Sequence, residues 1–235
     1  MAATRTSDPW QRYAWVAGIV FVIAFVADIV VSVGVGVNQD DSATKIAHAL
    51  HAHRERLLVV AYLSVVYAAT FLIYLGRLYD LLRGDTDRRR FLGSLVLAGG
   101  ALFVALHAVS DIGITGLLGA KLALFGAHDP GIAYTLYLLT FGLDSVGDVF
   151  GSLLAFAAGL LVIGSGVLPR WLGWISIIAG VMFLVQGFGL GGVIASFGLV
   201  VDLIGFVLFL IFVLVSSIIW LTRENADTHA ADGIH

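Results

Sequence analysis

The sequence predicts an all-α, polytopic membrane helix bundle with six transmembrane helices and one short amphipathic helix on the outer surface. Hydrophobic residues make up 60% of the chain and charged residues 12%, and the mean hydropathy is +0.99. Soluble domains carry about 25% charged residues. The apolar residues also gather into runs of at least the roughly 20 residues that a spanning helix needs. These runs cover residues 13–37, 57–82, 91–118, 133–165, 170–190 and 198–221.

The positions of the three prolines support these boundaries. Asp8-Pro9 and Asp129-Pro130 each have the pattern of an N-cap followed by proline at the first helical position. Pro169 directly precedes the fifth run. Because none of the prolines lies inside a run, we expect each helix to cross the membrane without a proline break.

A short amphipathic segment separates the first two runs. In residues 41–56, "DSATKIAHALHAHRER", Ile46 and Leu50 are four apart, so a helix here would present one apolar face to the membrane surface. We assign residues 1–224 to a single transmembrane domain. The remainder, 225–235, is expected to be a disordered cytoplasmic tail.

The distribution of Lys and Arg predicts the orientation. With six spans, most of these residues fall on the side that holds both termini, and lysine and arginine concentrate on the cytoplasmic side of membrane proteins. We therefore expect a multi-pass protein of the cytoplasmic (inner) membrane with both termini in the cytoplasm. That side carries Arg5, Arg12, Arg77, Arg83, Arg88, Arg89, Arg90, Arg170 and Arg223, and the other side carries Lys45, Arg54, Arg56 and Lys121.

Several classes of function are excluded by composition and motif. The chain has no cysteine, which rules out disulfides, thiolate nucleophiles, iron–sulfur clusters and cysteine-bound zinc. The Gly-x-Gly spacing in "QGFGLGGVIASFG" (186–198) follows no strand, so it does not indicate a nucleotide site. The expected partners are the lipid bilayer and a lipophilic small molecule, with no nucleic acid and with a homo-oligomer left open.

Two stretches resemble a known family. "GSGVLPRWLGWISIIAGV" (164–181) is similar to a recurrent stretch of an uncharacterised bacterial family of six-helix membrane proteins, and "ATKIAHALHAHRERLLVVAYL" (43–63) fits the layout of that family. The family is known as a domain of unknown function (group four-three-eight-six). The resemblance covers most of the chain; it implies the six-helix fold and supplies no activity.

Polar residues inside the predicted spans gather on one side of the membrane. Each charge at the membrane centre costs roughly 2.5–3.5 kcal/mol on insertion scales, so these side chains should face the bundle interior or a water-filled vestibule. All of them lie between the middle of a span and its outer end, which predicts an outward-facing acidic pocket. They are Asp28, His107, Asp111, Asp144, Asp148, Gln186 and Asp202.

The spacing of these residues suggests acid–base chemistry. His107 and Asp111 are four apart, as are Asp144 and Asp148, with Ser152 continuing the second stripe. Several carboxylates this close cannot all ionise without a cation, so some stay protonated or a cation neutralises them. A protonated aspartate is a general acid, and an ionised aspartate or His107 is the matching base. The leading hypothesis is a membrane enzyme that acts on a lipid- or isoprenoid-like substrate, for example by cyclisation or isomerisation.

In this hypothesis the catalytic residues are Asp144 and Asp148 as the acid–base pair, with His107 oriented by Asp111. Polar and aromatic side chains at similar depth are expected to complete the substrate-binding wall, and the phenylalanines could stabilise a cationic intermediate. These wall residues are Asp28, Asp202, Gln186, Phe103, Phe141, Phe150 and Ser152.

The same residues allow other interpretations. His107, Asp111, Asp144 and Asp148 could bind zinc, manganese or iron for metal-assisted hydrolysis. A proton- or cation-coupled transporter would use the acids as a relay, although the sequence shows neither inverted repeats nor a matching polar path in the cytoplasmic half. A lipid-binding accessory or sensory subunit would need the pocket alone, and polar contacts between helices could be purely structural. The outer histidines, His48, His51 and His53, could cover the pocket as a lid.

Overall fold

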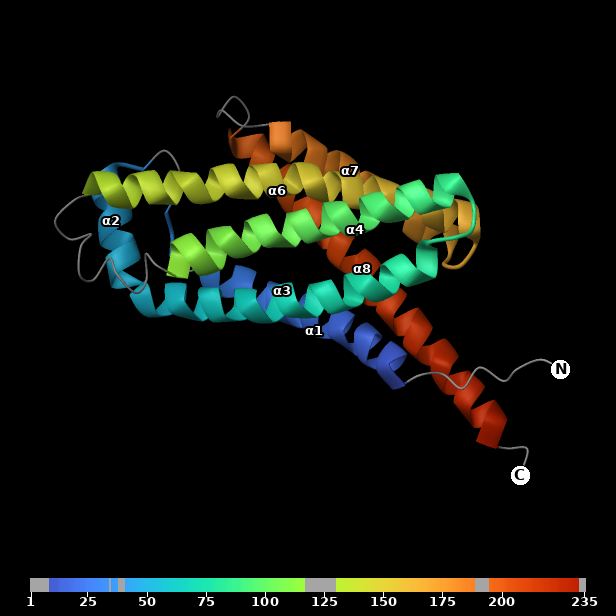
Figure 1. Cartoon of the computed structure of the whole chain (residues 1–235). Helices are drawn as coiled ribbons and strands as arrows, with labels where there is room; N and C mark the ends of the chain where they lie inside the picture. The colour runs from blue at the N-terminus through green and yellow to red at the C-terminus, as the bar shows by residue number, and fades with distance from the viewer. Residues whose placement is uncertain (1–8, 34, 38–40, 117–129, 189–194, 233–235) are drawn as a thin grey trace.

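The computed structural model describes residues 9–33, 35–37, 41–116, 130–188 and 195–232, and the regular secondary structure within them is helical (Figure 1). In these ranges six helices are long and apolar enough to cross a membrane, so the chain is a multi-pass membrane protein. In chain order the elements are α1 (Pro9–Val33), α2 (Ala43–Ala52), α3 (Arg54–Leu82), α4 (Asp87–Ala108), the π-helical segment η1 (Val109–Thr115), α6 (Pro130–Ser165), α7 (Arg170–Phe188) and α8 (Ala195–Asp232).

The helix starts agree with the proline pattern. α1 begins at Pro9 and α6 begins at Pro130. At the first position of a helix the backbone N–H has no partner within the helix, so proline, which lacks this N–H, loses no hydrogen bond there. α7 begins at Arg170, directly after Pro169, whose carbonyl accepts from the Leu172 N–H at 3.0 Å. The amphipathic segment forms α2 as expected.

The last helix extends beyond the predicted sixth span. Residues 225–232 continue α8 as helix to Asp232, and the disordered cytoplasmic tail assigned to 225–235 stays a prediction. The stretch "ENADTHAAD" contains neither proline nor glycine and is rich in alanine, so nothing stops the helix before Gly233. Figure 1 shows this part of α8 extending past the rest of the bundle.

Close helix packing depends on glycine at two contacts of α6. A Cβ on Gly99 of α4 would lie 2.9 Å from both the Leu154 nitrogen and the Phe150 oxygen of α6. A Cβ on Gly159 of α6 would lie 2.6 Å from the Gly173 oxygen of α7. The backbones therefore meet directly, as is common between helices in lipid, where small residues permit the closest van der Waals contact.

Aromatic rings fill the centre of the bundle. Phe71, Phe103, Phe183 and Phe209 come from four different helices, and the ring of Phe103 lies 5.6 to 6.1 Å from the other three. All four side chains are buried. This aromatic layer separates the two ends of the bundle, one of which carries α2 while the other carries the termini (Figure 1).

At the end that holds the termini, arginines fix the α6–α7 connection. Arg89 of α4 donates to the Gly164 carbonyl at 3.3 Å, and Arg223 of α8 donates to the Val167 carbonyl at 2.9 Å. Gly166 between them has a φ of +67°, a conformation that glycine adopts without strain. The stretch that resembles the family thus includes a turn that two other helices hold in place.

We expect Gly159→Ala to destabilise the protein by about 1–3 kcal/mol, because the added methyl group forces α6 and α7 apart. The measurement is reversible unfolding in mixed detergent micelles, followed by helicity. Gly142→Ala on the same helix is the matched control, since a Cβ there meets nothing within 4 Å. Equal stability of the two variants would contradict the proposed contact.

Candidate functional site

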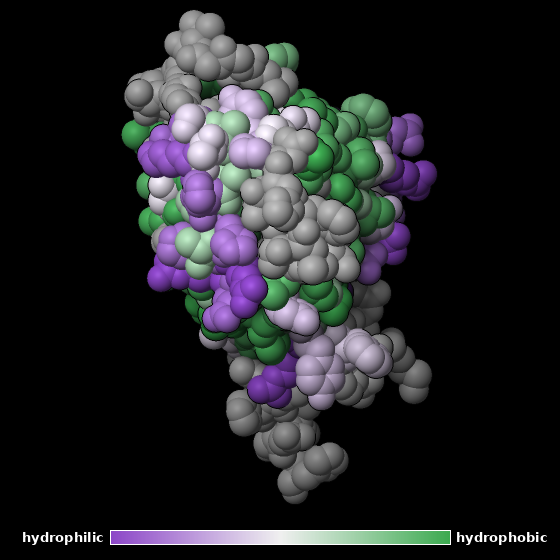
Figure 2. Space-filling model, turned by 90° about the vertical axis from the view of Figure 1, so that its left-hand side faces the viewer, coloured by the Kyte–Doolittle hydropathy of each residue, from purple (hydrophilic) through white to green (hydrophobic). Residues whose placement is uncertain are grey.

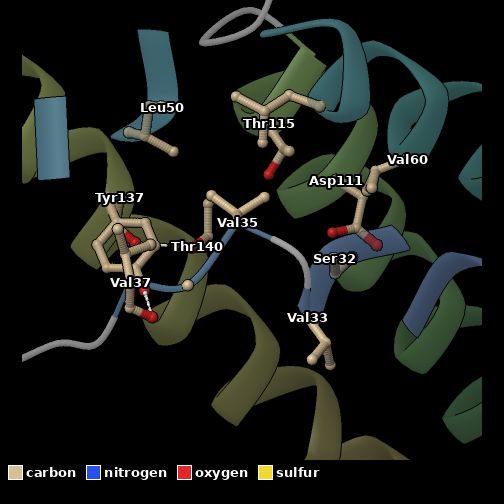
Figure 3. Close-up of a pocket in the computed structure, with 12 residues that line it drawn as sticks. Ser32, Val33, Val35, Val37, Leu50, Val60, Asp111, Thr115, Tyr137 and Thr140 are labelled. Atoms are coloured by element: carbon tan, nitrogen blue, oxygen red, sulfur yellow. Dashed lines mark hydrogen bonds between the residues drawn. The ribbon is translucent and has the colours of Figure 1, made fainter. Parts of the chain in front are cut away.

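A cavity of about 510 Å³ lies at the α2 end of the bundle. Its volume is within the range of roughly 300–1,000 Å³ that is usual for small-molecule sites. The end of α1 and the segment after it, together with parts of α2, α3, η1 and α6, enclose it (Figure 3). The wall is formed by the apolar residues Val33, Val35, Gly36, Val37, Leu50, Leu57 and Val60 and by the polar residues Ser32, Asp111, Thr115, Tyr137 and Thr140.

Helix α2 covers this cavity. Ile46, Ala47 and Leu50 form its buried face and pack in one apolar cluster with Val35, Leu57 and Ala133. The Ser42 side chain caps the helix by accepting from the Lys45 N–H at 3.3 Å. The polar face of α2 points outward, and Figure 2, which views this end of the molecule, shows hydrophilic side chains gathered on it.

The outer histidines do not form the lid that the sequence suggested. His48 and His51 are exposed, and neither they nor His53 belong to the described wall of the cavity. Helix α2 does cover the cavity, but it does so with Leu50, because its apolar face must turn toward the bundle.

Asp111 is the carboxylate on the described wall of the cavity, and a tyrosine holds it. The Tyr67 hydroxyl donates to Asp111 Oδ2 at 2.7 Å. Nearby, the Ser64 hydroxyl lies 3.4 Å from Asp28 Oδ1, and the carboxyl groups of Asp28 and Asp111 interact electrostatically. Asp28 is 7% exposed. Figure 3 shows the Asp111 carboxyl group among Ser32, Val60 and Thr115.

The π-helical turn η1 separates Asp111 from His107, which corrects the prediction that the aspartate orients the imidazole. In an α-helix these residues, four apart, would share a face, but a π-turn contains more residues and rotates those that follow. Asp111 consequently faces Tyr67 of α3, while His107 faces α6.

His107 and Asp148 form a second, deeper polar pair. His107 Nε2 lies 3.6 Å from Asp148 Oδ1, and His107 and Asp148 are 7% and 3% exposed. The other ring nitrogen, Nδ1, lies 2.9 Å from the Phe103 carbonyl oxygen. Gly147 makes room for the ring, because a Cβ there would lie 2.6 Å from His107 Cε1.

These contacts define the hydrogens on the imidazole. A carbonyl oxygen can only accept, so Nδ1 carries a hydrogen and donates it to Phe103. Nε2 is then the position that faces Asp148, and a bare nitrogen lone pair against an ionised carboxylate would be repulsive. A proton on Nε2 or on the Asp148 carboxyl group removes this repulsion.

The remaining predicted residues occupy separate places. Asp144 is half-buried on α6, one turn from Asp148, and Ser152 is buried one turn further, with its hydroxyl bound to the Val149 carbonyl. Phe141 packs edge-on against Tyr137, with ring centroids 5.0 Å apart. Phe103 lies against the imidazole, and Phe150 and Gln186 are half-buried. Asp202 belongs to α8, and its side chain lies outside the described residues.

The four residues considered for a metal do not converge. Within the described ranges, no group of three or more His, Cys, Asp or Glu side chains could hold a metal ion. The physical reason is the turn at η1, which directs Asp111 to α3 while His107 and Asp148 meet between α4 and α6.

Sequence reasoning missed the hydroxyl groups of the site. Ser64 and Tyr67 on α3 bind the carboxyl groups of Asp28 and Asp111, and Tyr137 and Thr140 on α6 line the cavity. A signal for the α3 pair does exist, since Ser64, Tyr67, Phe71 and Tyr74 recur every three to four residues and are all buried. The positions of charged residues do not reveal this stripe, because none of its members is charged.

Comparison with known proteins finds one family model, described as "Domain of unknown function (DUF4386)", that matches residues 16–222. No curated protein and no solved structure matches the chain.

We expect Tyr67→Phe to destabilise the protein by about 1–3 kcal/mol, because the buried hydroxyl that donates to Asp111 is lost. Unfolding in mixed micelles measures the change. Tyr62→Phe on the same helix is the control, since Tyr62 is 74% exposed. If both variants lose the same stability, the Tyr67–Asp111 hydrogen bond does not stabilise the bundle.

Proposed function

The chain belongs to the family described as a domain of unknown function (DUF4386), and from its cavity we propose that it is a membrane-embedded enzyme for a lipophilic substrate, with Asp111 as the acid–base group. One observation carries this proposal. A cavity of about 510 Å³ with mostly apolar walls has a carboxyl group on its wall that a buried tyrosine holds in place. Ligand pockets commonly combine an apolar lining with a few placed polar groups.

The lining suggests the class of substrate. Apolar side chains from four segments form most of the wall, and no Lys or Arg is among the described lining residues. A phosphate or carboxylate ligand would therefore find no positive partner here. The fitting molecule is lipophilic and carries one cationic or hydrogen-bond-donating group, which Asp111 would bind while Thr115, Tyr137 and Thr140 offer hydroxyl groups.

Asp28 gives Asp111 a partner for acid–base chemistry. The charge of one carboxyl group disfavours ionisation of a second one nearby, so the proposal gives the two groups one proton to share. The charged group is a base and the protonated group is an acid, and Ser64 and Tyr67 orient them. The proposal therefore places the chemistry at Asp111. Asp144 and Asp148, which the sequence suggested for this role, are not on the described wall of the cavity.

We further propose that the cavity opens on the outer side of the cytoplasmic membrane. The arginines at the opposite end, among them Arg89 of α4 and Arg223 of α8, which donate to the α6–α7 turn, match the positive charge that cytoplasmic loops carry. Both termini would then lie in the cytoplasm. A substrate for this site would arrive from the outer leaflet or the outer aqueous phase.

The test is native mass spectrometry of the protein released from lipid nanodiscs, followed by identification of any co-purified molecule. We expect a lipophilic adduct on the wild type that Leu50→Trp excludes by filling the cavity. Asp111→Asn removes the charge and should weaken binding roughly 10- to 100-fold, since a hydrogen bond to a charged group contributes about 1.5–3 kcal/mol.

The matched control is Asp80→Asn, because Asp80 is an exposed carboxylate on α3 that pairs with Arg83 and lies far from the cavity wall. An adduct that both cavity variants retain at the wild-type level would contradict the site. An adduct that binds at Asp111 and returns chemically unchanged after incubation would support the accessory or sensory alternative over the enzyme.

A further inference from the structure

The His107–Asp148 pair lies apart from the cavity and has no task in the chemistry assigned to Asp111. Neither residue is part of the described cavity wall, and both are more than nine-tenths buried. The two side chains come from different helices, α4 and α6, and meet through Nε2 and Oδ1 at 3.6 Å. A buried titratable pair in a membrane helix bundle commonly marks a path for protons or ions.

The geometry gives the pair a fixed proton count. Nδ1 keeps its hydrogen because the Phe103 carbonyl accepts it at 2.9 Å. One further proton, either on Nε2 of His107 or on the Asp148 carboxyl group, makes the pair neutral overall. Loss of that proton leaves a buried negative charge and gain of another leaves a buried positive charge, and each carries a large desolvation cost. The pair is therefore built to hold one proton.

Aromatic rings close the pair on the side toward the termini. The Phe103 ring centroid is 4.5 Å from that of His107, and the Phe206 ring meets the imidazole edge-on at 6.0 Å. Phe183 of α7 packs on both of these rings, at 5.7 and 5.0 Å. The ring contacts that α7 and α8 contribute here are thus hydrocarbon, which offers a proton no carrier.

The cavity side of the pair is different. Thr140, Asp144 and Asp148 follow one another at four-residue steps along α6, so they form one stripe with about 6 Å between successive levels. Thr140 lines the cavity, and Asp144 is half-buried between it and the pair. Among the described residues, the other titratable groups toward the cavity are Asp111 on η1, Asp28 on α1, Tyr67 on α3 and Tyr137 on α6. One or two water molecules can bridge each step of such a stripe.

We propose that His107 and Asp148 form a single-proton binding site that exchanges with the cavity through Asp144 and is closed toward the termini by the aromatic layer. The site couples binding of the proton to the charge inside the cavity. A positive charge that enters the cavity favours release of the proton along the stripe, and departure of that charge favours its return. This property does not depend on whether Asp111 performs catalysis.

The first experiment locates the proton in the wild-type protein itself. Protein with ¹⁵N-labelled histidine is measured by NMR in lipid nanodiscs, with His107 assigned by its loss in His107→Gln. Infrared difference spectra between the wild type and Asp148→Asn report the carboxyl group. We expect a protonated Nδ1 together with either a protonated Nε2 or a carboxylic acid band of Asp148. A bare Nε2 beside an ionised Asp148 overturns the proposal.

The second experiment tests the route. On transfer to D₂O, the signal of the shared proton should exchange several-fold more slowly in Asp144→Leu than in the wild type, with its position unchanged. Ser152→Ala is the matched control on the same stripe, one turn beyond Asp148, and should exchange at the wild-type rate. Wild-type exchange in Asp144→Leu contradicts loading through Asp144.

Ligand binding separates this proposal from the enzyme proposal. The Asp111→Asn variant should lose affinity for the adduct and keep the shared proton of His107 and Asp148. A protein that binds the adduct but shows no proton signal from His107 and Asp148 would refute the proton site alone. A protein that shows the proton signal but never forms the adduct would refute the substrate site alone.

Discussion

A polar group in hydrocarbon must find its partner within the protein, and this constraint determines how the helices of this chain are arranged. Water is absent from the bilayer core, and an unsatisfied polar group there costs several kcal/mol. Asp28 of α1 meets Ser64 of α3, Asp111 of η1 meets Tyr67 of α3, and Asp148 of α6 meets His107 of α4. Each contact joins two different helices, so satisfying the polar groups also specifies which helices are neighbours.

The same constraint gives the bundle polar groups at two levels. Asp111, near α2, lines a cavity large enough for a small molecule, while the His107–Asp148 pair lies against a layer of phenylalanine rings. Glycine makes the inner arrangement sterically feasible, because Gly147 and Gly151 of α6 leave space for the rings of His107 and Phe103. Small residues on one helix therefore make room for large polar or aromatic residues on its neighbour.

Much of the fold could be predicted because its causes are local. The spans follow from runs of apolar residues, and the starts of α1 and α6 follow from Pro9 and Pro130. The helix at the end of α8 has a local cause too, since Ala226 and its neighbours favour helix. Position along a span also gives the height of a residue along its helix.

Partners within the site could not be predicted in the same way. The choice between Asp111 facing His107 and Asp111 facing Tyr67 depends on the one turn at η1 where the backbone departs from the α-helix. The spacing of the charged residues does not predict this π-turn. Neutral partners such as Tyr137 and Thr140 became visible only when the helices were placed in three dimensions around a common cavity.

The π-helical turn also bears on the length of this segment. A π-turn holds one residue more than the α-turn that would span the same rise, so deleting one residue between His107 and Asp111 would allow a regular α-helix and leave the flanking parts of the span in place. The apolar character of the span and its ability to insert would be preserved, and the change would fall on the direction of the side chains within this turn. The extra residue is therefore not needed to cross the membrane, and its structural effect is to direct Asp111 toward Tyr67.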